Sequence, residues 1–128
     1  MGIFSGEREG IFITEHDIQD AIRIELSKSG GLCFRCNAGE FWQGSQVYSP
    51  ALGRDILIDI RRIAGFPKGF SDLLYLSPHG KVAFIEVKKP GGAVRPDQIK
   101  FIERMRSMGY TAGIAHSVEE AKGLVESL

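Results

Sequence analysis

A glutamate and a lysine two residues apart end an otherwise apolar stretch in the middle of the chain. The segment 81–90, KVAFIEVKKP, predicts a strand whose successive side chains point to opposite faces. One face carries Val82, Phe84, Glu86 and Lys88, and the other carries Ala83, Ile85 and Val87. Apolar residues on both faces indicate a sheet interior, where charge is costly unless it is paired or bound to metal. Glu86 and Lys88 are therefore active-site candidates, and an exposed strand-end ion pair is the alternative.

A second carboxylate is predicted to face Glu86. The segment 71–77, SDLLYLS, predicts another strand, and the connection to the next strand is so short that the two must form an antiparallel hairpin. If residues 78–80 form the loop, Asp72 lies opposite Glu86, with Cβ atoms about 5 Å apart. Like charges at that separation are destabilising, and a cation between them would relieve the repulsion. A loop one residue longer would shift the register and remove this pairing.

The residue types indicate phosphate chemistry. Carboxylates without His or Cys neighbours favour Mg²⁺ or Mn²⁺ over zinc. Such an ion can present a water molecule as nucleophile and neutralise charge on a phosphoryl oxygen. Lys88 could orient that water or contact the scissile phosphate as a point charge. We therefore expect Asp72 and Glu86 to be metal ligands and Lys88 to be the catalytic cation.

A first helix brings two more polar residues toward this region. Thr14 is a suitable N-cap, with Asp17 imitating a capping box, and Gly30-Gly31 ends the helix. Glu15 and Gln19 fall on its apolar stripe, at the N-terminal end. The stripe itself consists of Ile18, Ile22 and Leu26. A carboxylate on that side needs a partner. Glu15 is either a further metal ligand or a complement to the helix dipole.

The remaining segments predict an α/β fold. Strands are expected at 32–37 and 55–63, with a hairpin-like excursion at 41–63. A second helix should begin near Pro96 and end at Gly109, and its buried stripe is predicted to be Phe101, Ile102, Met105 and Met108, with Gln98 near the start. A strand at 110–116 and a short helix capped by Ser117 follow. The crossover makes strands 81–88 and 110–116 parallel. We expect one domain over residues 1–128, a mixed sheet flanked by helices, with 1–12 a loose lead-in.

Composition limits the function classes. Sixteen basic and sixteen acidic residues give zero net charge, which argues against indiscriminate coating of nucleic acid. Residues 54–106 carry 11 − 6 = +5, which would suit a basic face for phosphates or reflect accidental clustering. Cys33 and Cys36 lie on a predicted strand, so buried thiols are favoured over a redox or zinc pair. The chain shows neither a signal peptide nor a transmembrane run, so we expect a cytoplasmic protein without a membrane partner.

The ordered motifs resemble a known nuclease family. The chain contains G-F-S-D at 69–72, F-I-E-V-K-K at 84–89 and Gln98 in the next helix. This order is similar to the PD-(D/E)xK nuclease superfamily and, more narrowly, to the virus-type replication-repair nuclease (VRR-NUC) family. Glu15 with Gln19 resembles that family's first-helix motif, and Arg35, Asn37 and Gly39 resemble its R-x-N-x-G stretch. The resemblance runs from about residue 14 to 116. Ser71 stands where a proline often precedes the aspartate.

The resemblance implies a restriction-endonuclease-like core and an Mg²⁺- or Mn²⁺-dependent DNA endonuclease without an organic cofactor. It implies catalysis by Asp72, Glu86 and Lys88, and metal binding by Glu15, Asp72, Glu86 and the backbone carbonyl of Val87. Gln19 and Gln98 would support the site. Candidate DNA contacts are Arg35, Asn37, Arg61, Arg62, Lys68 and Lys89. Small stand-alone members of the family, from phages and bacteria, resemble Holliday junction resolvases. We therefore expect a homodimer that cuts branched DNA in a bacterial or phage-infected cell.

Three alternatives remain open on the sequence alone. A restriction-like nuclease without junction selectivity would use every residue named above. A non-catalytic DNA-binding dimer on the same fold would have no need of paired carboxylates. A scaffold with a structural ion pair predicts no metal dependence, whereas a nuclease predicts metal-dependent cleavage that is lost in Lys88→Ala.

Overall fold

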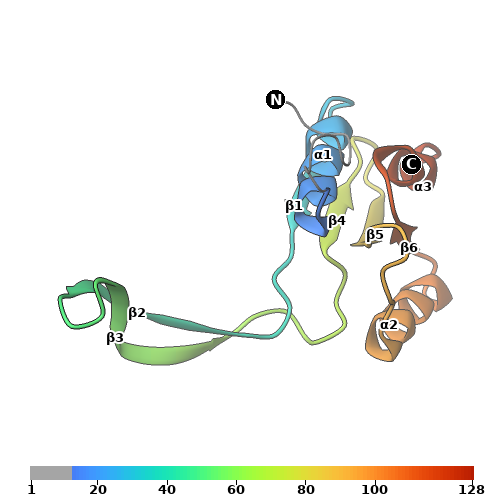
Figure 1. The fold of residues 1–128 in the computed structure, drawn as a ribbon. Helices are drawn as coiled ribbons and strands as arrows, with labels where there is room; N and C mark the ends of the chain where they lie inside the picture. The colour runs from blue at the N-terminus through green and yellow to red at the C-terminus, as the bar shows by residue number, and fades with distance from the viewer. Residues whose placement is uncertain (1–12) are drawn as a thin grey trace.

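The computed structural model describes residues 13–128, so the lead-in predicted over residues 1–12 lies outside the described residues. A four-stranded sheet in the order β1-β4-β5-β6 forms the body of the molecule (Figure 1). Its strands are β1 (Leu32–Arg35), β4 (Leu73–Leu76), β5 (Val82–Val87) and β6 (Thr111–Ala115). The first three pair antiparallel, and β6 runs parallel to β5 after the crossover through helix α2 (Pro96–Ser107). The predicted mixed sheet is confirmed.

Two helices cover one face of this sheet. Helix α1 (Glu15–Ser27) presents its apolar stripe to the sheet, and α3 (Val118–Val125) adds Ala121 and Val125. These side chains join one core with the alternate residues of the strands, among them Leu73, Ile85 and Val87. The capping box predicted at Thr14 forms and fixes where α1 begins.

Aromatic side chains fill the opposite face, beneath α2. Phe84 points away from the core that contains its neighbour Ile85, and its ring packs edge-on against Phe101 and Tyr110, with centroids 5.5 and 5.6 Å away. Phe70 also contacts Phe84 and Phe101. Strand β5 is thus covered on both faces, which explains its apolar composition.

The stripe predicted for α2 is wrong at its C-terminal end. Ile102 is buried, whereas Met108 is about half exposed. Met108 is the C-cap rather than a helical residue. The chain leaves helical geometry there, so the helical spacing no longer carries the side chain toward the sheet.

The hairpin register predicted from the short loop is confirmed. Leu73 pairs with Ile85 and Leu76 pairs with Val82, and the backbone N–H of Ser77 donates to the carbonyl of Lys81 at 2.8 Å. Extending this register by one residue places Asp72 opposite Glu86.

A two-stranded ribbon projects from the body (Figure 1). It consists of β2 (Glu40–Ser49) and β3 (Arg54–Ala64), paired antiparallel with a bulge between Gln43 and Ser45. We call residues 40–64 the arm. Three backbone hydrogen bonds close its root. The N–H of Gly65 donates to the carbonyl of Gly39 at 2.9 Å, the N–H of Gly39 to the carbonyl of Phe66 at 3.0 Å, and the N–H of Phe66 to the carbonyl of Asn37 at 3.0 Å.

Within residues 13–128, no helix is long and apolar enough to cross a membrane. Both cysteines are free thiols, Cys36 buried and Cys33 half-buried. Burial raises the pKa of the Cys33 thiol to about 11, and burial also raises the pKa of Cys36. Neither thiol has the character of a redox nucleophile.

Candidate active site

Glu86 is a buried carboxylate with one unsatisfied oxygen. It lies near the end of β5, on the face turned toward α2, and only 2% of it is exposed. Its Oε2 accepts a hydrogen bond from Gln98 Nε2 at 2.7 Å. Its Oε1 is buried and has no hydrogen-bond partner among the described residues. Since an unpaired buried carboxylate oxygen is costly, a ligand at this position would be stabilising.

The hairpin holds Asp72 across from Glu86. Asp72 Oδ2 accepts the backbone N–H of Val87 at 2.9 Å, and its carbonyl accepts the N–H of Cys36 at 2.8 Å. These bonds tie the aspartate to the two neighbouring strands. Preceding it, Ser71 is buried and its hydroxyl donates to the carbonyl of Leu73, so a serine fits where a proline was the familiar residue.

The electrostatics of Glu86 are dominated by its burial. Burial raises the pKa of Glu86 to about 8, the neighbouring Asp72 carboxylate adds to the rise, and Lys88 and Arg95 oppose it. Lys88 is itself buried, with its Nζ 3.8 Å from Glu86 Oε2. That separation is too long for a direct hydrogen bond. The ammonium therefore only partly offsets the two carboxylates.

The first turn of α2 positions Gln98 over Glu86. The Gln98 carboxamide is buried, and its Oε1 accepts the backbone N–H of Arg95 at 3.0 Å while its Nε2 donates to Glu86. Gly69 lets the loop before Asp72 pass close to this turn. It adopts φ +92°, and a Cβ there would lie 2.7 Å from the carbonyl oxygen of Asp97.

Glu15 and Gln19 reach the same region from α1. Both are half-buried, and Glu15 Oε2 lies 3.4 Å from the backbone N–H of Lys89. A Cβ on Gly92 would lie 3.1 Å from that oxygen, so the chain after β5 runs close beside Glu15. Glu15 therefore lies beside the end of β5, in the region where the sequence predicted it.

One polar cavity of about 340 Å³ unites these side chains. Its lining includes all six residues proposed from the sequence for catalysis, metal binding or support through their side chains: Glu15, Gln19, Asp72, Glu86, Lys88 and Gln98. Arg35 and Asn37 also line it, with Arg35 paired to Asp20 at 2.7 Å.

Sequence reasoning missed Arg95, which lines the same cavity and lies close enough to Glu86 to lower its pKa. Its place just before Pro96, at the N-cap of the helix that carries Gln98, was the available signal.

The other proposed DNA contacts lie outside this cavity. Lys68 and Lys89 are exposed on the loops before Asp72 and after β5. Arg61 and Arg62 lie on the arm, where each is bonded within the ribbon, Arg61 to Gln43 and Arg62 to Glu40. Of the proposed DNA contacts, only Arg35 and Asn37 share the cavity with the carboxylates.

The residues present fit a divalent cation only in part. Over residues 13–128, no three His, Cys, Asp or Glu side chains lie close enough together to hold an ion by themselves. The free Oε1 of Glu86 and the facing Asp72 carboxylate nevertheless form an oxygen-rich site. The neighbouring Asp72 charge helps to raise the pKa of Glu86, and a cation between the two carboxylates would relieve that repulsion. Mg²⁺ takes one or two carboxylates and keeps several waters, so two carboxylates suffice for it.

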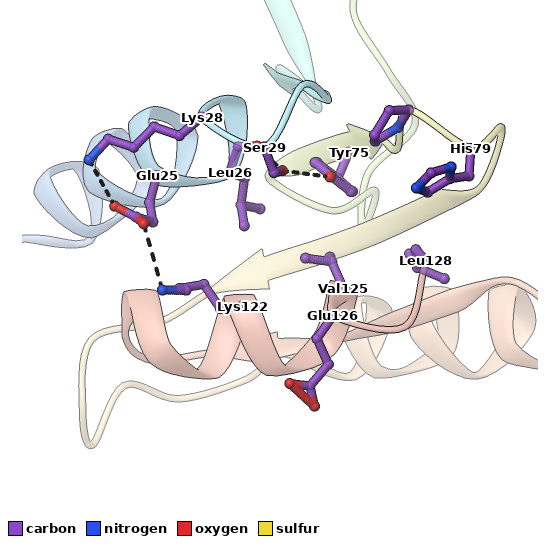
Figure 2. Close-up of a pocket in the computed structure, with 11 residues that line it drawn as sticks. Glu25, Leu26, Lys28, Ser29, Tyr75, His79, Lys122, Val125, Glu126 and Leu128 are labelled. Carbon is purple, nitrogen blue, oxygen red and sulfur yellow. Dashed lines mark hydrogen bonds and ion pairs between the residues drawn. The ribbon is translucent and has the colours of Figure 1, made fainter.

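A second cavity, of about 420 Å³, lies between α1, α3 and the β4–β5 turn (Figure 2). Its charged side chains largely satisfy one another, since Lys28 and Lys122 both pair with Glu25, at 3.2 and 3.6 Å. Figure 2 shows Ser29 and Tyr75 directed toward each other. This cavity contains no pair of facing carboxylates and none of the residues proposed for chemistry.

The fold is the mixed-sheet α/β core that the sequence predicted. The VRR-NUC domain model matches residues 13–119. Because this match spans most of the chain, the chain belongs to the VRR-NUC family, a family of nucleases. It is similar to a solved structure described as a VRR_NUC domain, with 23% identity, a TM-score of 0.57, and coverage of 88% of this chain and 96% of that chain. Among curated proteins, none matches the chain.

Proposed function

We propose that this chain is an Mg²⁺- or Mn²⁺-dependent endonuclease that hydrolyses DNA phosphodiester bonds. The observation that carries the proposal is the buried Glu86 carboxylate, which keeps one oxygen free while facing Asp72 and lying beside buried Lys88. A structural ion pair would bring the lysine into hydrogen-bonding distance and would not need the second carboxylate.

The metal ligands in this proposal are Asp72, Glu86 and the backbone carbonyl of Val87. Glu15 is the further ligand proposed from the sequence, and it would have to move toward the other two carboxylates to share an ion with them. A bound Mg²⁺ or Mn²⁺ would supply a polarised water and stabilise charge on the phosphate. Gln98 keeps Glu86 in a single orientation through its 2.7 Å hydrogen bond, so the free Oε1 stays directed at the ligand position. Gln19 would support Glu15 at the mouth of the cavity.

Lys88 is the proposed catalytic cation. Its ammonium is held in the cavity wall, nearly excluded from solvent, beside the carboxylates. From there it can hold the attacking water or contact the scissile phosphate, where its charge is more effective than in bulk water. Arg35, Asn37, Lys68 and Lys89 are proposed contacts to the DNA backbone around this centre.

The proposed substrate is branched DNA, with four-way junctions preferred, and the proposed active form is a homodimer in the cytoplasm of a bacterial or phage-infected cell. Two active sites related by a two-fold axis would face two strands of a junction. The resemblance to small VRR-NUC proteins supports this finer assignment. The charge distribution supports DNA as the substrate, since the carboxylate centre lies within the segment of the chain that carries excess basic charge.

The test is cleavage of four labelled substrates, a four-way junction, a flap, a duplex and a single strand, each with Mn²⁺ and with chelator. We expect Mn²⁺-dependent cutting, fastest on the junction, that is lost in Lys88→Ala. Lys81→Ala is the matched control, because Lys81 is exposed beside the β4–β5 turn, at the opposite end of β5 from Lys88.

Each contrary outcome removes a specific part of the proposal. Equal background cleavage of all four substrates, with or without metal, would contradict the proposal that the protein is a nuclease. Tight DNA binding without cutting favours a non-catalytic DNA-binding dimer. Equal rates on duplex and junction leave a nuclease without junction selectivity.

A further inference from the structure

The arm exposes more large apolar side chains than any other part of the described chain. Trp42 and Tyr48, for example, are 56% and 62% exposed. The other large apolar residues exposed on the arm are Phe41, Leu52, Leu57, Ile58, Ile60 and Ile63. Such a concentration of exposed large apolar side chains on one element is typical of a site of association in a soluble protein.

The arm is also poorly supported by its own molecule. Its two strands pack extensively only against each other, and an isolated two-stranded ribbon is marginally stable in water. Strand β3 is 11 residues long and contains no Pro, and its five charged residues lie at positions 54, 55, 59, 61 and 62. The run Ile56-Leu57-Ile58 is therefore free of the charges that commonly block pairing at an exposed strand edge, and its two isoleucines have high β-propensity. Because an uncovered strand edge can pair with other chains, we expect this edge to be covered in the active form of the protein.

Charge argues against DNA as the molecule that covers the arm. Residues 40–64 contain three basic and three acidic residues, so their net charge is zero. The bonds from Arg61 to Gln43 and from Arg62 to Glu40 already use both guanidinium groups within the ribbon. Surfaces that bind the DNA backbone are strongly basic, whereas neutral apolar surfaces bind protein.

We infer that the arm is the dimerisation element of this protein and that its partner is the arm of a second copy. An antiparallel pair of identical strands is related by a two-fold axis, so a long free edge is complementary to itself without any other sequence. The exposed apolar area of the eight large side chains is on the order of 800 Å², so an interface that buried most of it would match the share of one partner in a stable complex.

This assembly would link dimerisation to the active site. Phe41, at the root of the arm, lines the cavity that contains Asp72 and Glu86. Pairing of two arms would therefore set the spacing of two cavities on a two-sited nuclease. The inference deepens the homodimer in the proposed function and rests on it.

Light scattering after gel filtration provides the test, with Leu57→Lys and Ile58→Lys as the variants. We expect the full chain to have twice its 14.1 kDa mass at micromolar concentration. Either lysine should raise the dimer dissociation constant by roughly tenfold or more, because it places an unpaired charge in an apolar interface. Both side chains are already exposed in one copy, so the protomer should fold normally, as circular dichroism can verify. Ile24→Lys is the matched control, since Ile24 is 62% exposed on α1.

Fluorescence gives an independent readout, because Trp42 is the single tryptophan and lies on the arm. Its emission should shift to the red on dilution, with the same midpoint as the loss of dimer mass. A dimer that persists in both lysine variants, or whose formation leaves Trp42 emission unchanged, overturns the inference while leaving the homodimer intact. A monomer whose Trp42 emission responds only to DNA overturns both in favour of DNA contact. Loss of nuclease activity alone, in a wild-type dimer, counts only against the proposed function.

Discussion

The environment of Glu86 is the strongest argument for an active site rather than a structural ion pair. Its burial and the facing Asp72 raise its pKa, and Gln98 satisfies only one of its two oxygens. A fold that needed only stability would be served equally well by apolar residues at these positions. This cost is the physical basis for the cation that we propose at the site.

The first prediction concerns metal binding without catalysis. Saturating Mn²⁺ should raise the melting temperature of the wild-type protein by on the order of 5 °C, because a ligand that binds only the folded state stabilises it by mass action. Glu86→Gln should remove most of this shift, since an amide is a poor ligand for a hard cation. Differential scanning fluorimetry in Mn²⁺ and in chelator measures the effect. Glu126→Gln, an exposed carboxylate on the other side of the fold, should keep the full shift. Equal shifts in both variants would place the ion elsewhere.

The second prediction concerns the two thiols and pH. Because burial raises the pKa of Cys33 to about 11 and raises that of Cys36, the reactive thiolate is scarce in the folded protein at pH 8. Iodoacetamide at pH 8 should therefore leave the native protein unmodified and alkylate both cysteines in denaturant, as intact mass can show. Labelling of Cys33 should rise as the pH approaches its pKa. Rapid double labelling of native protein at pH 7 would contradict the burial of these thiols.

At the scale of elements, the sequence predicted best where local geometry leaves few options. The three-residue loop at 78–80 determines the register of β4 and β5, and that register brings Asp72 to Glu86. Met108 shows the limit of periodicity, because a spacing rule cannot tell where a helix stops. Arg95 was missed for a related reason. Its proximity to Glu86 depends on how α2 packs on the sheet, which is a long-range contact.

The third prediction tests how closely α2 must approach the loop that leads to Asp72. Gly69→Ala should cost roughly 3 kcal/mol of unfolding free energy, because the new Cβ meets the carbonyl of Asp97 and the backbone keeps a positive φ. Gly80→Ala is the matched control, with φ +80° but nothing within 4 Å of its Cβ, and should cost only about 1–2 kcal/mol. Urea denaturation of both variants gives the comparison. Equal losses of unfolding free energy in the two variants would mean that the positive φ alone, without the close approach to Asp97, accounts for the glycine at position 69.

At the scale of the whole molecule, the sequence predicted a hairpin-like excursion at 41–63 and one of its strands, at 55–63, but neither strand β2 nor the separation of the arm from the body. The alternating pattern at 55–63 predicts a strand, but it does not indicate which other strand pairs with it. Whether it adds to the main sheet depends on side chains and edges far away in the sequence. The apolar residues of the arm resemble those of a core strand, and only the structure shows that they remain exposed in a single copy.

The last prediction separates the roles of body and arm in binding DNA. With chelator present to prevent cleavage, Arg95→Ala should weaken binding to a four-way junction and reduce the slope of log affinity against log salt by about 1, because it removes one charge beside the cavity. Arg61→Ala and Arg62→Ala test the two arm arginines proposed from the sequence as DNA contacts. They should change the slope less, since their guanidinium groups are bonded within the ribbon. Fluorescence anisotropy at several salt concentrations measures all three. A larger loss from the arm variants, with the dimer intact, would make the arm a DNA-binding element.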